Sequence, residues 1–345
     1  MRITVIVMVV VAFMLIFAMS ACKKKKVVEK PMPMTQISVN RDNVLVWLDV
    51  TRNDTQRAFD SLDTNRKQIG VLSPAMYLLK DGKVILNEKI GPNTVSDMKY
   101  ACEKNEPKVK IRPLFGNVDQ VGAHGDEALK ILENPALQKN AIAAIVKVVA
   151  DPNYIGVDID WEEIPVDKIH LLADFLVKLA PPIHKAGKTL SVVLEAWNVR
   201  NEWRQIAEVV DYVEFMAYPE HHPGTGPGPI ASLSWATRNL EMALKVVPRA
   251  KLVFCMPFFG YIWNVFGPID VKWSEVMSKP RNSTVVVYKR DMEGNPNFQF
   301  RNGEGWYEDA YSINQKMLMA KKYRIGQFGF WQIGGEDPGV WKSLN

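Results

Sequence analysis

Eight short apolar runs, rich in β-branched residues, recur along the chain and limit the folds that it can form. They cover residues 44–50, 70–79, 109–115, 154–160, 189–194, 212–216, 252–256 and 327–331. Segments with helical periodicity separate many of them, at residues 127–133, 136–149, 167–184, 201–209 and 233–246. Alternating strands and helices indicate a parallel sheet covered by helices, and eight such strands predict an α/β (β/α)8 TIM barrel. An open doubly wound sheet is the alternative, but the chain has no G-x-G-x-x-G or P-loop motif to support it.

Two stretches interrupt the alternation. Residues 80–83, Lys-Asp-Gly-Lys, lie between two apolar segments and predict a hairpin turn. Residues 266–305 include a strand-like segment and a stretch rich in Gly, Asn and Pro, which predict a small β-rich insertion between the seventh and eighth strands. The barrel with its insertion is expected to occupy residues 41–345.

The N-terminus has the order of an export signal. Arg2 precedes the apolar residues 3–19, and the small residues Ser20 and Ala21 follow, as in a signal peptide spanning residues 1–21. A permanent membrane span is the alternative, because about 17 apolar residues are the lower limit for crossing a bilayer. Met-Ser-Ala-Cys at 19–22 resembles a bacterial lipobox, in which Cys22 takes a diacylglycerol.

The lipobox resemblance implies an exported protein of the bacterial cell envelope. Lipid chains on Cys22 would anchor it to a membrane, and the lysines at 23–26 would lie at the headgroups. Residues 22–40 are expected to serve as anchor and tether.

Outside the leader the charges balance. The formal net charge is +5. Residues 1–30 contain Arg2 and five lysines but only one acid, Glu29, so residues 31–345 contain 37 basic and 37 acidic residues. A broad basic face for nucleic acid is therefore not expected. Three cysteines cannot form a disulfide framework or a zinc cluster, and Cys255 is expected in the core.

The fourth run carries a row of acids. Side chains alternate between the two faces of a strand, so Asp158, Asp160 and Glu162 share the face toward the barrel lumen, whereas Glu163 points away. Same-face neighbours are roughly 6.6 Å apart, so the three acids cannot all ionise in a poorly solvated site. At least one carboxyl stays protonated, as a general acid requires. A solvated strand edge and a divalent metal site are the alternatives, but no His or Asn nearby supplies obvious further ligands.

Four ordered motifs resemble glycoside hydrolase family 18, the chitinase-like barrels. Gly-Val-Asp-Ile-Asp-Trp-Glu at 156–162 is similar to the family's D-G-x-D-x-D-W-E, with Ile155 in place of the opening Asp. Met-Ala-Tyr at 216–218 resembles its M-x-Y, and similarity continues over 251–260 and from 306 to Trp331, so that it covers about residues 43–345. Residues 220–221, 227–231 and Trp235 resemble the spore-germination-type branch, which acts on peptidoglycan.

The position of each acid and the resemblance together imply a mechanism. Glycosidases normally place two carboxylates across the sugar ring, whereas here the candidates share one strand, as in the substrate-assisted family 18. Glu162 would protonate the leaving oxygen, Asp160 would hold the acetamido N–H, and Asp158 would share a proton with Asp160. By resemblance, the Tyr218 hydroxyl would hold the acetamido carbonyl and Trp331 would form the apolar floor.

Further residues near strand ends are candidates for binding the glycan. They are Met216, which shares the face of Tyr218, and Asn117, Trp47, Tyr77, Trp197, Tyr261, Trp263 and Glu195.

The resemblance has one departure that keeps a second function open. The acid that usually follows the Tyr of M-x-Y is Pro219 here, followed by Glu220. The leading hypothesis is an anchored, retaining endo-β-N-acetylglucosaminidase acting on peptidoglycan or a chitin-like glycan. A lectin-like, non-catalytic member and a metal-dependent hydrolase are the alternatives. No cofactor is expected, and the protein is expected to be a monomer.

Overall fold

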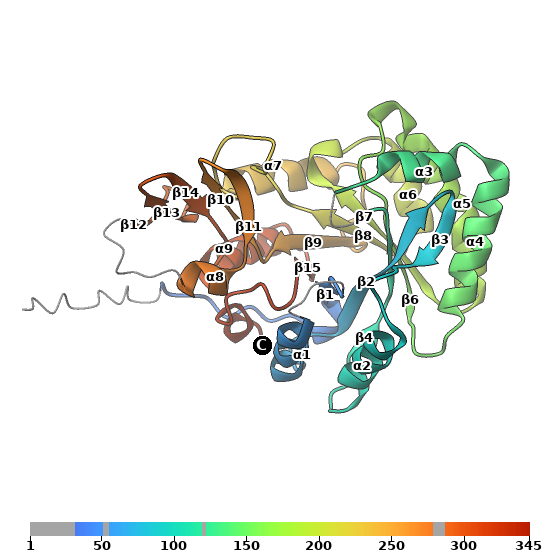
Figure 1. The fold of residues 1–345 in the computed structure, drawn as a ribbon, viewed down its shortest axis with the longest axis horizontal. Helices are drawn as coiled ribbons and strands as arrows, with labels where there is room; N and C mark the ends of the chain where they lie inside the picture. The colour runs from blue at the N-terminus through green and yellow to red at the C-terminus, as the bar shows by residue number, and fades with distance from the viewer. Residues whose placement is uncertain (1–31, 51–54, 119–121, 279–286) are drawn as a thin grey trace, which may run out of the picture. The chain divides into compact units, whose positions relative to one another are not determined.

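Eight parallel strands close into a barrel in the computed structural model, which describes residues 32–345 except 51–54, 119–121 and 279–286 (Figure 1). Neighbour by neighbour they are β1 (Val44–Leu48), β2 (Val71–Lys80), β5 (Leu114–Gly116), β6 (Gly156–Asp160), β7 (Thr189–Glu195), β8 (Tyr212–Met216), β9 (Leu252–Pro257) and β15 (Gln327–Trp331). Because β1 pairs with both β2 and β15, the ring is closed and the predicted TIM barrel is confirmed.

The third predicted strand, 109–115, is split in two. A short β4 (Lys110–Ile111) pairs with β2 before β5 begins. Pro113 lies between them and has no N–H to donate to a neighbouring strand, which interrupts the ladder.

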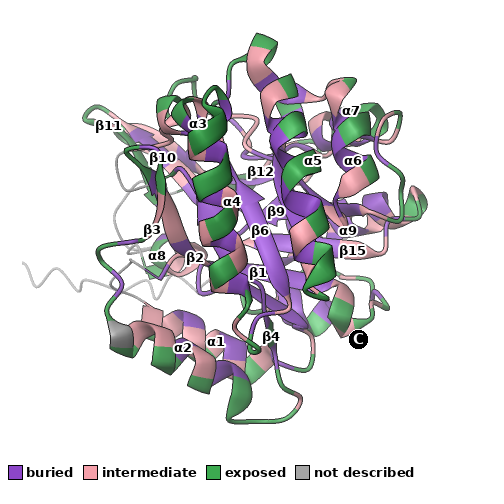
Figure 2. Cartoon of the chain, turned by 90° about the vertical axis from the view of Figure 1, so that its right-hand side faces the viewer, coloured by how far each residue is buried: buried purple, intermediate pink, exposed green. Residues whose placement is uncertain are grey.

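Helices surround the barrel, with their buried faces toward it (Figure 2). They are α1 (Thr55–Asn65), α2 (Pro92–Glu103), α3 (Gly125–Leu132), α4 (Pro135–Val149), α5 (Ile169–Lys185), α6 (Glu202–Val209), α7 (Leu233–Ala243) and α9 (Ala310–Lys322). Short 3-10 turns are η1 (Arg41–Asn43), η2 (Val166–Lys168), η3 (Ala196–Asn198) and η4 (Val340–Ser343). In α5 the apolar positions are buried, and Phe175 packs on Trp161 of the barrel wall with ring centroids 4.6 Å apart.

Apolar side chains form separate layers outside and inside the barrel. The outer layer includes Val157 and Ile159 of β6, both fully buried beneath the helices. The inner layer includes Val193, Val253 and Cys255. Cys255 is therefore core, as predicted.

The hairpin and the insertion are both present. β3 (Lys83–Leu86) runs antiparallel to β2, with Lys80 opposite Lys83, as predicted. Between β9 and β15 lies a five-stranded antiparallel sheet of β10 (Gly260–Asn264), β11 (Gly267–Val271), β12 (Val287–Arg290), β13 (Pro296–Phe300) and β14 (Gly303–Trp306), with α8 (Trp273–Ser278).

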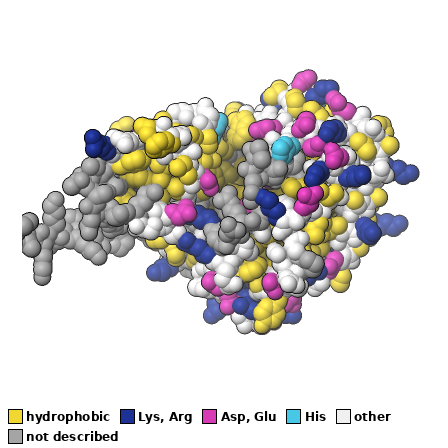
Figure 3. Space-filling model, in the orientation of Figure 1, with side chains coloured by type: hydrophobic (Ala, Val, Ile, Leu, Met, Phe, Trp, Pro, Cys, Tyr) yellow, Lys and Arg dark blue, Asp and Glu magenta, His cyan; other side chains and the backbone are white. Residues whose placement is uncertain are grey.

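The insertion starts earlier than residue 266, the boundary that the sequence predicts. β10 begins at Gly260, because the alternating segment Gly260–Asn264 pairs with β11 on one side and β14 on the other. Tyr261 and Trp263 therefore belong to the insertion and not to the end of a barrel strand. Figure 3 shows hydrophobic side chains gathered over the insertion, and Val265 and Phe266 are 71% and 95% exposed there.

The predicted tether is shorter than residues 22–40. Ile37 is buried, and its N–H donates to the carbonyl of Ser343 at 2.8 Å, beside the last residues of the chain. This strand-like pairing makes residues 35–40 part of the folded unit, so the predicted boundary is wrong there. The predicted signal peptide and Cys22 lie outside the described residues. Within the described residues, no helix combines the length and apolar character needed to cross a membrane.

Candidate active site

β6 carries the predicted acids into the lumen. Asp158 and Asp160 are both buried, and Val157 and Ile159, which alternate with them, face the helices. Gly156 starts the strand, where a Cβ would lie 2.2 Å from the Thr189 carbonyl oxygen, so only glycine lets β6 approach β7 this closely. The predicted alternation is therefore observed up to Asp160.

Asp158 is held by three donors from three other strands. Its Oδ2 accepts from Trp47 Nε1 at 2.9 Å and from Ser73 Oγ at 2.8 Å, and its Oδ1 accepts from Ser191 Oγ at 2.8 Å. Trp47 is 1% exposed, so its predicted stacking on sugar is wrong. It fixes Asp158 instead.

Glu162 and Asp160 form a coupled pair of acids at the cleft. Burial, helped by Glu195 and Glu163, raises the pKa of Glu162 to about 8. Burial, with Glu162 and Asp158 nearby, also raises the pKa of Asp160 well above its ordinary value. Glu162 therefore keeps its proton at neutral pH, as general acid catalysis requires.

Asn117 positions Glu162 from the end of β5. Its Nδ2 donates to the carbonyl oxygens of Glu162 and His124, and its Oδ1 accepts the Glu162 N–H at 2.8 Å. Asn117 is 1% exposed and both of its amide hydrogens are used, so it could bond a sugar hydroxyl only through Oδ1, and that predicted contact stays a prediction.

The alternation ends before Glu163. Its φ is +56°, a left-handed backbone that terminates the extended chain. Gly125 makes this turn possible, because a Cβ there would lie 2.3 Å from the Glu163 carbonyl oxygen. Besides burial, the negative charge of the exposed Glu163 carboxyl raises the pKa of both Glu162 and Glu195, so Glu163 influences the protonation of the site.

Tyr218 and Met216 lie in the lumen beside the acids, as predicted. Both belong to the inner apolar layer and are buried. Burial, with Cys255, Asp160 and Glu162 nearby, raises the pKa of Tyr218 well above its ordinary value, so its hydroxyl stays protonated as a donor.

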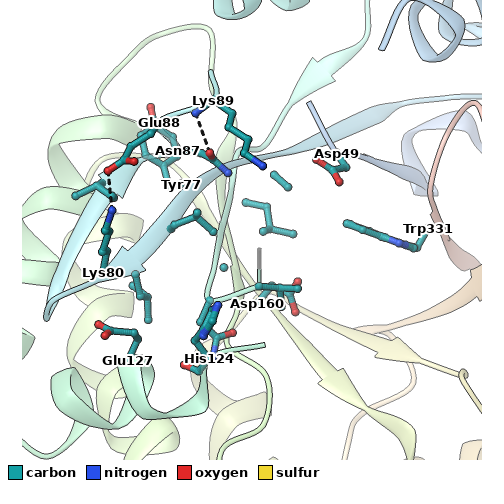
Figure 4. Close-up of a pocket in the computed structure, with 18 residues that line it drawn as sticks. Asp49, Tyr77, Lys80, Asn87, Glu88, Lys89, His124, Glu127, Asp160 and Trp331 are labelled. Carbon is teal, nitrogen blue, oxygen red and sulfur yellow. Dashed lines mark hydrogen bonds and ion pairs between the residues drawn. The ribbon is translucent and has the colours of Figure 1, made fainter. Parts of the chain in front are cut away.

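A cavity of about 500 Å³ opens above Asp160 (Figure 4). Trp331 and Asp49 line one side, and the β2–β3 hairpin with Lys89 lines another. An aromatic wall beside a buried acid is an arrangement suited to a sugar ring.

Four other predicted binding residues have different surroundings. Tyr77 borders the cavity, but its ring stacks on Phe115 with centroids 4.5 Å apart. Trp197 is 53% exposed, Tyr261 packs edge-on to Trp263, and Trp263 is 9% exposed. Whether any of them contacts a glycan stays a prediction.

Glu195 and Glu220 take distinct places. Glu195 ends β7 beside Glu162, and burial raises its pKa. The Oε2 of Glu220 accepts the Ser232 N–H at 2.7 Å, directly before α7. Glu220 therefore helps to hold the start of α7.

Arg112 and Glu214 form a buried pair in the lumen that the sequence did not predict. Arg112 and Glu214 have side chains 4% and 0% exposed and are hydrogen-bonded to each other. A charged residue within the apolar run 212–216, on the face of Met216 and Tyr218, was the available signal. Among the described residues, no group of three or more His, Cys, Asp or Glu is arranged to hold a metal ion.

Comparison with known proteins matches this chain to one family. The model of glycosyl hydrolases family 18 matches residues 6–336. YdhD of Bacillus subtilis is 28% identical over 253 residues, covering 67% of this chain, and the cortical fragment-lytic enzyme of Bacillus subtilis is 22% identical over 245 residues, covering 65%. The match spans only 60% and 57% of these two relatives.

Solved structures share the fold. A chitinase from Chromobacterium violaceum has a TM-score of 0.75 at 22% identity, covering 87% of this chain and 96% of its own. The spore cortex-lytic enzyme SleL of Bacillus megaterium has a TM-score of 0.75 at 19% identity, covering 91% of this chain and 75% of its own.

Proposed function

This chain belongs to glycosyl hydrolases family 18, and from that premise we propose that it cleaves β-linked glycans of N-acetylated amino sugars with retention of configuration. The observation that carries the proposal is the Glu162 carboxyl, whose pKa burial raises to about 8, next to Asp160, which itself lines the aromatic-walled cavity. A general acid with that pKa can protonate a leaving oxygen at neutral pH.

In the proposed reaction the substrate supplies the nucleophile. Its acetamido oxygen attacks the anomeric carbon while Glu162 gives its proton to the leaving oxygen. The buried Oδ1 of Asp160 accepts no hydrogen bond from the described residues. In the reaction Asp160 accepts a hydrogen bond from the acetamido N–H and stabilises the positive oxazolinium. Tyr218 donates to the acetamido oxygen. Glu162, now ionised, activates water to open the ring, and Trp331 forms the floor beneath the sugar.

We propose peptidoglycan as the substrate in preference to chitin. The cortical fragment-lytic enzyme and SleL are named for action on spore cortex, and the sequence resembles that branch at residues 220–235. Lys89 supports this choice, because it lines the cavity and forms no ion pair within the described residues. An ammonium group there suits the carboxylates that muramic acid and its peptides carry.

We also propose that the protein is exported and held at a membrane of the bacterial envelope by lipid on Cys22. Support comes from residues 1–22 alone, with their basic, apolar and small segments followed by cysteine.

A lectin-like function is the second candidate. Pro219 stands where the family usually has an acid, and Glu220 is bonded to Ser232. Mass spectrometry of products after incubation with peptidoglycan and with chitin oligomers distinguishes the two functions. Reducing ends released by wild type and not by Glu162→Gln support hydrolysis, whereas binding without products from either protein supports the lectin.

A further inference from the structure

The ion pair of Arg112 and Glu214 spans the lumen below the catalytic acids. Arg112 lies between β4 and β5, Glu214 lies on β8, and β6 and β7 separate them in the ring. With side chains 4% and 0% exposed, neither residue reaches water.

Glu214 has an oxygen without a donor. Its Oε1 accepts from Arg112 Nη2, whereas its Oε2 is buried and has no well-aligned hydrogen bond within the described residues; the Ser191 hydroxyl lies near the carboxyl and by itself lowers its pKa. Asp158 lies beside it within hydrogen-bonding reach, and burial together with that negative neighbour raises the pKa of Glu214 well above its ordinary value. An orphaned carboxylate oxygen next to a second carboxylate is costly, unless a proton lies between them.

Counting charges gives the same result. One guanidinium and two carboxylates would leave a net negative charge in this buried space, and a single shared proton makes the group neutral. Asp158 already accepts hydrogen bonds from Trp47, Ser73 and Ser191, whereas Oε2 of Glu214 accepts none. The proton therefore belongs on Oε2, from which it is donated to Asp158.

We infer that Glu214 is a positioning residue held in its protonated form, whose Oε2–H donates to Asp158 and so keeps Asp158 from drawing a proton away from Asp160. Asp160 then remains available to the substrate's acetamido group and to Glu162. The catalytic consequence rests on the proposed function, but the protonation of Glu214 does not.

Other groups also face Glu214 from the surrounding strands. Asp160 on β6, Cys255 on β9, Tyr218 after β8 and Ser191 on β7 all interact with it, and the ring of Tyr212 lies against Arg112. Among the described residues, Arg112 is the cation that lies with these groups.

Infrared spectroscopy tests the proton directly and needs no activity. A protonated buried carboxyl gives a C=O stretch separate from that of carboxylates. We expect the spectrum of wild type minus Glu214→Gln to contain this band at pH 7, with the band still present in Glu162→Gln. Absence of the band from the difference spectrum would overturn the inference, whatever the protein does to glycans.

The pH profile of kcat/KM tests the catalytic consequence. The Gln side chain in Glu214→Gln is neutral and its amide can donate to Asp158. The acid limb, which is the part of the pH profile where kcat/KM falls as pH decreases, should therefore not move. The double variant Arg112→Met with Glu214→Met removes the guanidinium and the carboxyl while filling the space, and such replacements commonly keep a protein folded. Without the cation in the lumen, the ionised form of Asp160 is disfavoured, so the acidic side of the pH profile should move to higher pH.

Glu308→Gln is the matched control, because Glu308 is also buried and paired, with Lys316 at 2.8 Å, but lies outside the lumen. Its effect should fall on stability and not on the acid limb. If the double variant folds and its acid limb lies at the same pH as in wild type, the pair has only a structural role. A limb that moves down in Glu214→Gln would show that Glu214 is an anion.

Discussion

Asn117 and Glu162 are joined by two backbone-directed hydrogen bonds that run in opposite directions. The Asn117 amide donates to the Glu162 carbonyl at 2.8 Å and accepts the Glu162 N–H at 2.8 Å. The residue after β5 thus fixes the main chain of the proposed general acid, Glu162, which lies beyond the end of β6 and has no strand partner there.

Loss of these two hydrogen bonds should reduce turnover more than substrate binding. Asn117→Asp keeps the acceptor but cannot donate, so Glu162 should shift and kcat should fall about 100-fold, the loss typical of a misplaced catalytic group. Steady-state kinetics on peptidoglycan fragments measure the fall. Asn239→Asp is the control, since Asn239 is a buried Asn on α7 that bonds the Trp235 carbonyl. Equal losses in both variants would argue against this role of the two hydrogen bonds.

Glu162→Gln should lower the hydrolysis rate by about 10²- to 10⁴-fold and leave oligosaccharide affinity little changed, because Gln keeps the shape but cannot act as an acid. Kinetics together with calorimetric titration separate the two effects. A variant that loses binding along with rate would contradict an acid role.

Glu163→Gln should instead move the basic limb of the pH profile. Glu163 helps to raise the pKa of Glu162 to about 8, so removing its charge lowers that pKa. Glu162 then loses its proton at a lower pH, and activity declines earlier as pH rises. Only a small change in maximal rate is expected, and a basic limb that does not move would show that Glu163 has no influence on Glu162.

The same stretch shows how far sequence reasoning reaches. Asp158 and Asp160 could be placed in the lumen because alternation is a local property of a regular strand. It fails at Glu163, where the left-handed backbone ends the pattern. The partners of Trp47 and Asn117 lie 111 and 45 residues away, and nothing local reveals that their polar atoms are already used.

The barrel itself could be predicted, whereas the insertion boundary and the lumen ion pair could not. Eight apolar runs are enough to count strands, but β10 follows β9 so closely that the two resemble one segment. Arg112 and Glu214 each look anomalous in an apolar run, and only the closed ring brings them together.

Lys89 should select for acidic glycans. The neighbouring charges on its side of the cavity are paired, Lys80 with Glu88 and Glu127 with Lys130. Lys89→Met should therefore lower kcat/KM about tenfold on peptidoglycan, the loss of one charged hydrogen bond of ~1.5 kcal/mol, and little on chitin oligomers. Lys83→Met, on the same hairpin but away from the cavity, is the control. Equal losses on both substrates would exclude selection by charge.

Cys22→Ala should separate the protein from the membrane. Without the thiol no lipid can be added, so the variant should appear as soluble protein or as an uncleaved precursor. Fractionation of cells and mass spectrometry of the N-terminus measure this. A wild-type protein found wholly soluble outside the cell would exclude the lipid anchor.

The nucleophile is the last point that experiment can decide. The acids gathered around Glu162 are Asp158 and Asp160 from β6 and Glu195 from β7, which are adjacent strands on one side of the cavity. With the acids on that side, the proposed nucleophile is the substrate's own acetamido group. Matched oligomers with and without the acetyl group on the reacting sugar should then differ sharply, and the de-N-acetylated one should resist cleavage even where it binds.

A thiazoline analogue of the cyclised intermediate sharpens this test. It should inhibit, and Asp160→Asn should weaken it more than substrate, because an enzyme binds the transition state more tightly than the ground state. Comparable cleavage rates on the two oligomers would require a protein nucleophile. Glu195 would be the first residue to replace, and Asp49, which lines the cavity from the side of Trp331, would be the second. Full activity in Glu195→Gln and Asp49→Asn, combined with dependence on the acetyl group, would leave the substrate as the nucleophile.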